Sequence, residues 1–354
     1  MITGLTIQNF RGFRDMTLEG LARVNLLVGD NGSGKTALLE AIDLAASNTI
    51  LSALAHRRAR GLPSRTGTVE LVLHGDLAGD DKDATIALRL GDGTMRSLRI
   101  FLDKWEPVPV GTLSPSGPQT YLYDGQTVEE AGRGRVTFEW KTGDTVRGVS
   151  RFTLAGSVIS GKSAEIEPLP ASYLKPTEVQ WADAASVFSE YDKAGDATEI
   201  VKSMNSQFPD LSGLSVQLEG SFPILHARFG SHGRLRPLNA LSAGLTKLAS
   251  MMMMIAQPGG ALVLIDEIEN GLHHARFRLL WQQVRDFAAQ FDTQVFATTH
   301  SLECLDAAAD AMSAHPEDFA LMRTVRTEDK GCLVGLLPGA RAGQLVRSRL
   351  EVRG

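Results

Sequence analysis

The sequence predicts an α/β protein with a mixed sheet, an antiparallel β subdomain and a short helical arm. Three observations lead to this fold class. A strand, a glycine-rich turn and a helix follow one another near the N-terminus, short strands separated by turn residues fill residues 66–170, and apolar strands alternate with helices over residues 236–354. Alternating strands and helices predict parallel strands covered on both faces, whereas short strands with tight turns predict antiparallel hairpins.

The first segment, residues 1–65, contains two predicted strands and one predicted helix. Leu5–Ile7 alternates apolar and polar residues, Val24–Val28 is a mostly apolar run, and Ala37–Ala46 has helical spacing. Between the second strand and the helix, Gly29–Thr36 fits the pattern G-x-x-x-x-G-K-[ST]. Because the motif follows a strand and precedes a helix, we predict a phosphate-binding loop.

The residue types of this loop suit a triphosphate and its metal ion. Glycines let backbone N–H groups curl around phosphate oxygens, and the helix N-terminus adds positive partial charge. Lys35 would place its charge on the β- and γ-phosphates, which makes it a catalytic candidate, and Thr36 would offer its hydroxyl to Mg²⁺. The predicted nucleotide contacts of the loop are Gly29, Asn31, Gly32, Ser33, Gly34, Lys35 and Thr36.

The spacing of apolar residues changes twice in the middle of the chain. Residues 66–170 predict an antiparallel β meander, because short apolar runs are separated by Gly, Asp, Pro and Ser. The clearest of these runs are Val69–Leu73, Thr85–Leu90, Leu98–Leu102 and Val136–Trp140. Residues 171–235 predict linking strands and one or two short helices between Trp181 and Phe208, without the sustained heptads of a coiled coil.

An acidic pair follows a buried strand in the last segment. The elements predicted there are strands at Ala261–Ile265 and Thr293–Ala297, helices at Ala275–Gln290 and Leu302–Met312, and a final hairpin at Phe319–Leu337. Asp266 and Glu267 come directly after the first of these strands. Combined with the phosphate loop, they predict that Asp266 holds Mg²⁺ together with Thr36 and that Glu267 orients or activates the attacking water.

Two further segments could contact phosphate, although each alone has an ordinary structural explanation. Ser242, Ala243 and Gly244 begin a predicted helix, where small residues can bind an anion or simply cap the helix. His300 follows the strand Gln294–Thr298 at the edge where α/β sheets bind ligands, although a lone histidine is more often structural. Their interpretation as phosphate contacts therefore depends on the other two motifs.

Together these motifs resemble the ABC-type heads of P-loop NTPases, and most closely the RecF, SMC and OLD-like branch. The resemblance covers residues 1–50 and 235–310 and rests on Ile7–Phe13, the phosphate loop, the Leu-Ser-x-Gly signature and Ile265–His273. It implies one head built from four interleaved parts, which are residues 1–65, 66–170, 171–235 and 236–354.

The resemblance also implies roles for individual residues. The segment Ser242–Gly244 would contact the γ-phosphate bound by the opposite subunit, and Asn270 would couple the two sites across the dimer. His300 would be the catalytic switch histidine, and Arg11 would lie near the nucleotide. The sequence departs from the family pattern at Ala243, where many members have a second glycine, and at His274, where the branch often has proline. Gln180 is a candidate for the Q-loop glutamine.

The implied cofactors are ATP and Mg²⁺, and the implied working unit is an ATP-dependent homodimer. In the OLD-like branch such a dimer switches nucleic-acid processing, commonly in phage defence. We expect a separate nuclease-like effector, because the segment after His300 is too short for a fused TOPRIM nuclease domain. The alternatives are a DNA-binding or repair clamp of the RecF and SMC type and, with a poorer fit to the N-terminal motif, a transporter cassette.

Composition and net charge restrict the binding partners and the cellular compartment that we expect for the chain. Its formal net charge is −5, so any contact with DNA or RNA should be weak and local. The densest basic cluster is Arg57, Arg58 and Arg60, which also fits a solvated helix end. No apolar run is long enough to span a membrane. Cys304 and Cys332 have no metal-ligand spacing, so we expect reduced thiols in a cytoplasmic protein.

Overall fold

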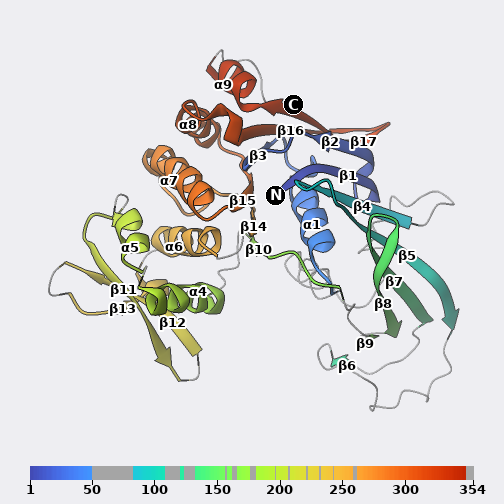
Figure 1. The fold of residues 1–354 in the computed structure, drawn as a ribbon, viewed down its shortest axis with the longest axis horizontal. Helices are drawn as coiled ribbons and strands as arrows, with labels where there is room; N and C mark the ends of the chain where they lie inside the picture. Colours follow the sequence, from blue (N-terminus) through green and yellow to red (C-terminus); the bar gives the residue numbers. More distant parts are fainter. Residues whose placement is uncertain are drawn as a thin grey trace.

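Figure 1 shows the fold of the chain in a computed structural model. The structure describes residues 1–49, 83–107, 120–122, 132–155, 158–161, 166–175, 181–195, 197–205, 208–220, 222–230, 233–241, 243–257 and 261–347. The predicted strand Val69–Leu73 lies outside these residues.

One large mixed sheet organises the described part of the chain. Its 14 strands follow the order β10 (Ala171–Leu174), β14 (Leu262–Ile265), β15 (Gln294–Thr298), β3 (Val24–Val28), β16 (Phe319–Thr327), β17 (Gly331–Pro338), β2 (Phe13–Glu19), β1 (Ile2–Phe10), β4 (Asp83–Leu90), β5 (Met95–Pro107), β7 (Gly132–Thr142), β8 (Thr145–Ala155), β9 (Val158–Gly161) and β6 (Thr120–Leu122). The first five are parallel and the rest pair antiparallel.

The parallel half is covered by helices on both faces. Helix α1 (Lys35–Ala46) lies on one face, and α6 (Ala243–Ile255), α7 (Phe277–Gln290) and α8 (Leu302–Ala311) lie on the other (Figure 1). Every residue of β3, β14 and β15 is buried, as expected for strands between two helical layers. Side chains of a strand alternate between faces, so Leu27 of β3 packs in the core with α1, whereas Leu26 packs in the core with the other helices.

The antiparallel half confirms the predicted meander and joins the parallel half. Strands β4, β5, β7 and β8 pair in sequence order, and β1 pairs with both β2 and β4. The C-terminal hairpin β16–β17 bridges the halves, because β16 pairs with β3 and Gly331 of β17 pairs with Phe13 of β2. The predicted final hairpin is therefore present, and it links the two predicted sheet regions.

Arg96 of β5 ties the meander to the C-terminus of α1. Arg96 is only 5% exposed, and its guanidinium donates to the carbonyl oxygens of Ala45, Ala46, Ser47 and Glu167 at 2.8 to 3.1 Å. The last carbonyls of a helix have no partner within the helix, and a cation there also complements the helix dipole. Burial lowers the pKa of Arg96, so these four acceptors offset a desolvation cost.

We expect Arg96→Met to lower the free energy of unfolding by roughly 2 to 4 kcal/mol, because it leaves several buried carbonyls unpaired. Urea unfolding followed by circular dichroism measures the loss. Arg99→Met on the same strand is the matched control, since Arg99 is 46% exposed and pairs with Asp83, a kind of contact worth about 1 kcal/mol or less. Equal midpoints for the two variants would contradict this role of Arg96.

A smaller sheet and two helices form a separate corner of the molecule. The sheet contains β11 (Leu211–Glu219), β12 (Phe222–Phe229) and β13 (Arg236–Pro237). It packs against α4 (Trp181–Ala194) and α5 (Ala197–Asn205), which confirm the predicted short helices. The sequence predicted only linking strands here, and it did not predict α9 (Gly339–Arg347). Within the described residues, no helix is both long and apolar enough to span a bilayer.

Candidate nucleotide-binding site

The phosphate loop has the backbone that its glycines allow. Gly29, Gly32 and Gly34 have φ angles of 146°, 76° and 107°, which side chains strongly disfavour. Gly29 also lies against Thr324 of β16, where a Cβ would overlap the backbone oxygen of that residue. Gly34 is the N-cap residue of α1, so the loop leads directly into the helix N-terminus. This is the strand, loop and helix order that the motif requires.

The side chains of Lys35 and Ser33 are both held by hydrogen bonds. The Lys35 side chain is buried, and its ammonium donates to the carbonyl oxygens of Gly29 at 2.7 Å and Asp30 at 2.9 Å. The Ser33 hydroxyl lies 2.6 Å from that of Thr324, which itself donates to the Val28 carbonyl. Thr324 thus fixes the loop from the neighbouring strand, a role that the sequence did not reveal.

Asp266 joins the loop to two strand ends. One carboxylate oxygen accepts from the Thr36 hydroxyl at 2.9 Å, and the other accepts from the Thr298 hydroxyl at 2.6 Å. The structure therefore brings Thr36 and Asp266 together, as predicted for two magnesium ligands. Thr298 was missed, although its position gives a signal. It is a polar residue at the end of the apolar strand β15. Because its neighbour Ala297 pairs with Ile265, Thr298 lies level with Asp266, the residue that follows Ile265.

Glu267 sits on an unusual backbone. Its φ of 52° lies in the left-handed region, which costs energy for a residue with a Cβ and often marks functional sites. The surroundings hold this conformation, because the Glu267 N–H donates to the Thr298 hydroxyl at 2.8 Å. Its carbonyl oxygen accepts from the ammonium of Lys247 on α6. The predicted catalytic carboxylate is thus carried by a firmly fixed turn.

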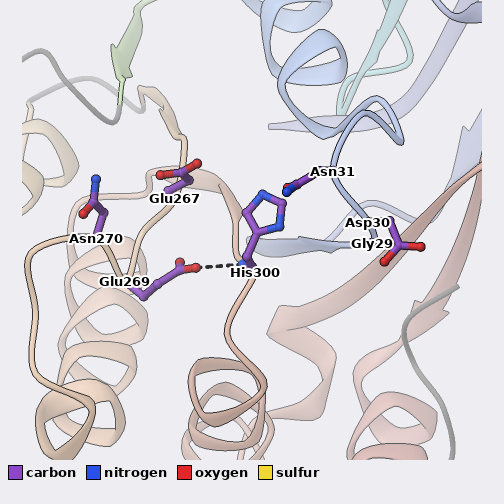
Figure 2. Close-up of a pocket in the computed structure, with 7 residues that line it drawn as sticks. All are labelled: Gly29, Asp30, Asn31, Glu267, Glu269, Asn270 and His300. Carbon is purple, nitrogen blue, oxygen red and sulfur yellow. Dashed lines mark hydrogen bonds between the residues drawn. The ribbon is translucent and has the colours of Figure 1, made fainter.

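A polar pocket of about 520 Å³ opens at this edge of the sheet (Figure 2). It is lined by Gly29, Asp30, Asn31, Glu267, Glu269, Asn270 and His300. Figure 2 shows the His300 ring between Asn31 and the loop that carries Glu267 and Glu269. The carboxyl ends of parallel strands meet here, which is where α/β sheets bind ligands. Five predicted site residues line the pocket, and Asp30 and Glu269 join them.

His300 is fixed through its backbone. Its N–H donates to one carboxylate oxygen of Glu269 at 2.7 Å, which orients the loop after β15 toward the loop after β14. Glu269 could have been singled out from its place in Asp266–Asn270, two residues after the catalytic candidate. Its contact with His300 spans 31 residues, however, and is visible only in three dimensions.

Arg11 reaches the back of the phosphate-loop helix. Its guanidinium forms an ion pair with Glu40 of α1, and the two side chains are only 9% and 3% exposed. It also lies 5.3 Å from the centre of the Phe10 ring. Among the described residues, Arg11 does not line the pocket. The structure thus connects it to α1, while its proximity to the nucleotide stays a prediction.

The signature segment begins α6 beside the acidic loop. A Cβ on Gly244 would lie 2.7 Å from the carbonyl oxygen of Gly271, so only glycine allows this close approach. Ala243 is the first residue of the helix. Ser242, Gln180 and the basic cluster Arg57, Arg58 and Arg60 lie outside the described residues. Their predicted roles therefore stay predictions.

Comparisons with known proteins match this chain to AAA domain families and to an ATP/GTP phosphatase. A family model described as "AAA domain, putative AbiEii toxin, Type IV TA system" matches residues 154–306, and a second, described as "AAA domain", matches residues 4–96. The chain is 20% identical over 341 residues to an ATP/GTP phosphatase of Helicobacter pylori, which covers 86% of this chain and 87% of that protein.

Relatives named DNA replication and repair protein RecF match a shorter stretch. The Cronobacter sakazakii protein is 37% identical over 103 residues, which are 27% of this chain and 26% of the relative. A RecF of Yersinia pseudotuberculosis is 36% identical over the same length. The match thus spans about a quarter of these RecF proteins.

Two solved SMC head structures share the fold. One, an SMC head bound to the C-winged helix domain of ScpA, has a TM-score of 0.54 and 14% identity, covering 97% of this chain and 99% of that one. The other, an Smc head with an extended coiled coil bound to the C-terminal domain of ScpA derived from Pyrococcus furiosus, has a TM-score of 0.50 and 13% identity, covering 98% and 99%. The chain, with its phosphate loop and the acidic pair after β14, is thus similar to AAA-family and RecF ATPase domains, and it shares the fold of SMC heads.

Proposed function

We propose that this chain binds ATP with Mg²⁺ at the pocket of Figure 2 and hydrolyses it. The observation that carries the proposal is the contact between Thr36 and Asp266, which puts a hydroxyl and a carboxylate 2.9 Å apart beside the phosphate loop. Oxygen ligands of this kind suit Mg²⁺. Thr36 and Asp266 would hold the ion, which neutralises charge on the β- and γ-phosphates when it is bound.

The protein's own groups account for the rest of the chemistry. The Lys35 ammonium donates hydrogen bonds to two neutral carbonyl oxygens, and an anionic phosphate would be a stronger acceptor for it. The loop amides and the N-terminus of α1 add donors. Glu267 lines the pocket and can take a proton from the attacking water, and His300 can donate a hydrogen bond to the γ-phosphate. The ATP/GTP phosphatase similar to this chain supports the assignment.

The proposed working unit is an ATP-dependent homodimer with shared sites. Within the described residues, the pocket is lined from the phosphate loop, the loop after β14 and His300, and α6 contributes none of its residues. Gly244 packs against the chain's own Gly271 in the acidic loop. The start of α6, like other helix N-termini, can bind an anion, so it suits the γ-phosphate of a partner subunit. Two such contacts about a two-fold axis make a closed interface.

Mixing two inactive variants tests the shared site. Lys35→Ala disables the phosphate loop and Ser242→Arg disables the signature, so a mixed dimer keeps one site with both groups intact. Random mixing at equal amounts should restore up to about a quarter of wild-type ATPase activity, because half of the dimers are mixed and each has one competent site. Each variant alone is the control. No recovery on mixing, with confirmed subunit exchange, would mean that each subunit works alone.

For the wider role we propose a cytoplasmic OLD-like switch that drives a separate nuclease-like effector in nucleic-acid processing or phage defence. The family model that matches residues 154–306 is described as a putative AbiEii toxin, which supports a toxin-like role for such a switch. The alternative is a repair clamp of the RecF and SMC type, which the 37% identity to RecF favours. In the solved SMC heads, a ScpA domain is bound, so a protein partner fits either role.

A further inference from the structure

Lys247 is a buried cation between the signature helix and the acidic loop. It lies one turn into α6, is 7% exposed, and its ammonium donates to the Glu267 carbonyl oxygen at 2.5 Å. Burying an ammonium group costs desolvation free energy unless the charge is paired and hydrogen-bonded. The contact it makes is to the backbone of the residue with the left-handed φ, so it bears directly on where the Glu267 carboxylate points.

Glu269 completes this arrangement. One of its carboxylate oxygens accepts the His300 N–H, while the other is buried and has no hydrogen-bond partner among the residues that the structure describes. Burial lowers the pKa of Lys247 to about 8, and Glu269 is the strongest of the groups that oppose the shift, followed by Glu267, Asp266 and Cys304. The acidic groups of the site therefore favour the charged form of Lys247, whose ammonium donates to the Glu267 carbonyl oxygen.

We infer that Lys247 is a positioning residue that fixes the turn of Glu267 and, with Glu269, links the signature helix to the catalytic loop and to His300. The inference rests on the proposed ATPase function and adds a connection between the signature helix and the catalytic loop of the same subunit. The start of α6 would meet the partner's γ-phosphate, whereas Lys247, one turn further along, holds Glu267 in its own site. ATP in one site would thereby set the catalytic carboxylate of the other.

The test compares Lys247→Met and Lys247→Arg with wild type. We expect Lys247→Met to lower kcat for ATP hydrolysis by at least about tenfold while the Kd for a slowly hydrolysed fluorescent ATP analogue stays within about threefold, as for a group that acts on transition-state geometry. Lys247→Arg keeps the charge and should recover part of kcat. Lys193→Met, at an exposed position of α4, is the control and should match wild type.

The pH profile adds a readout that a packing role alone would not move. Lys247 loses its charge above pH of about 8, so wild-type kcat should fall there. Arginine stays protonated throughout this range, so the fall should shift to higher pH in Lys247→Arg. An alkaline limb at the same pH in both proteins would contradict the inference.

The remaining outcomes separate the inference from the proposed function. If wild type hydrolyses ATP, Glu267→Gln does not, and Lys247→Met turns over within twofold of wild type, only the inference fails. If Lys247→Met loses ATP affinity and melting temperature together with kcat, Lys247 is merely structural. If Lys247→Met does not fold, the isosteric variant Glu269→Gln tests the contact with His300 instead. Unchanged ATP turnover by Glu269→Gln would then overturn the inference. If the wild-type protein has no ATPase activity, the proposed function itself is contradicted.

Discussion

Glu267→Gln is expected to lower kcat for ATP hydrolysis by roughly 100-fold or more while leaving ATP affinity nearly unchanged. The amide has the shape of the carboxylate but cannot accept a proton from water. The turn that carries the residue should persist, because it is held through backbone contacts to Thr298 and Lys247. Steady-state phosphate release gives kcat, and titration with a fluorescent ATP analogue gives Kd.

Glu199→Gln is the matched control, since its side chain is 62% exposed on α5 and should not affect turnover. Equal turnover by Glu267→Gln and wild type would remove the catalytic assignment. The same variant, trapped with ATP, is also the bait for the proposed effector. A nuclease that co-purifies with it would support the defence switch, whereas duplex DNA alone would favour the repair clamp.

Lys35→Ala is expected to weaken ATP binding itself by at least about 100-fold, or roughly 3 kcal/mol. The Lys35 ammonium is positioned at the loop by the Gly29 and Asp30 carbonyls, so a charge required in the ground state disappears. Calorimetric titration with ATP and Mg²⁺ measures the loss. Lys202→Ala, at a 64% exposed position, should bind as wild type does. Tight ATP binding by Lys35→Ala would place the triphosphate elsewhere.

The two expected results differ in kind, and that difference is diagnostic. Removal of the Lys35 ammonium should weaken ATP binding and therefore also lower turnover, whereas removal of the Glu267 carboxylate should lower turnover and leave binding nearly unchanged. A chain that used the pocket only to sense nucleotide, without hydrolysis, would respond to the first change and not to the second.

The parts of the site that the sequence predicted are those encoded in short continuous segments. The phosphate loop brings its donors together within eight residues, and Asp266 and Glu267 directly follow their strand. Parallel strands then place these segments at one edge of the sheet, so the contact between Thr36 and Asp266 could be expected. Local chemistry and one topological rule were sufficient here.

Contacts between distant segments could not be predicted in this way. Thr324 reaches Ser33 across 291 residues of sequence, and Lys247 reaches the Glu267 backbone from a helix that looks like an ordinary apolar one. Neither side chain has a motif of its own. Only the packing of β16 on β3 and of α6 on the loop after β14 gives them a role.

The small sheet was missed for a different reason. Leu214, Val216 and Leu218 alternate with polar residues, which signals a strand and fits the predicted linking strands. The alternation does not reveal that β11 pairs with β12, and β12 with β13, in a sheet of their own. The adjacent Pro223 and the turn at Gly220 weaken the strand signal.

The pairing of β3 also determines when the site can form during synthesis. This strand carries the phosphate loop at residue 29, but both of its neighbours come late in the chain, β15 at residues 294–298 and β16 at residues 319–327. At ribosomal rates of about 5 to 20 residues per second, the strand waits on the order of 10 to 50 s for its first partner. A nascent chain therefore cannot complete the nucleotide site before residues 294–327 have been synthesised, and until then the apolar β3 lacks both of its partner strands.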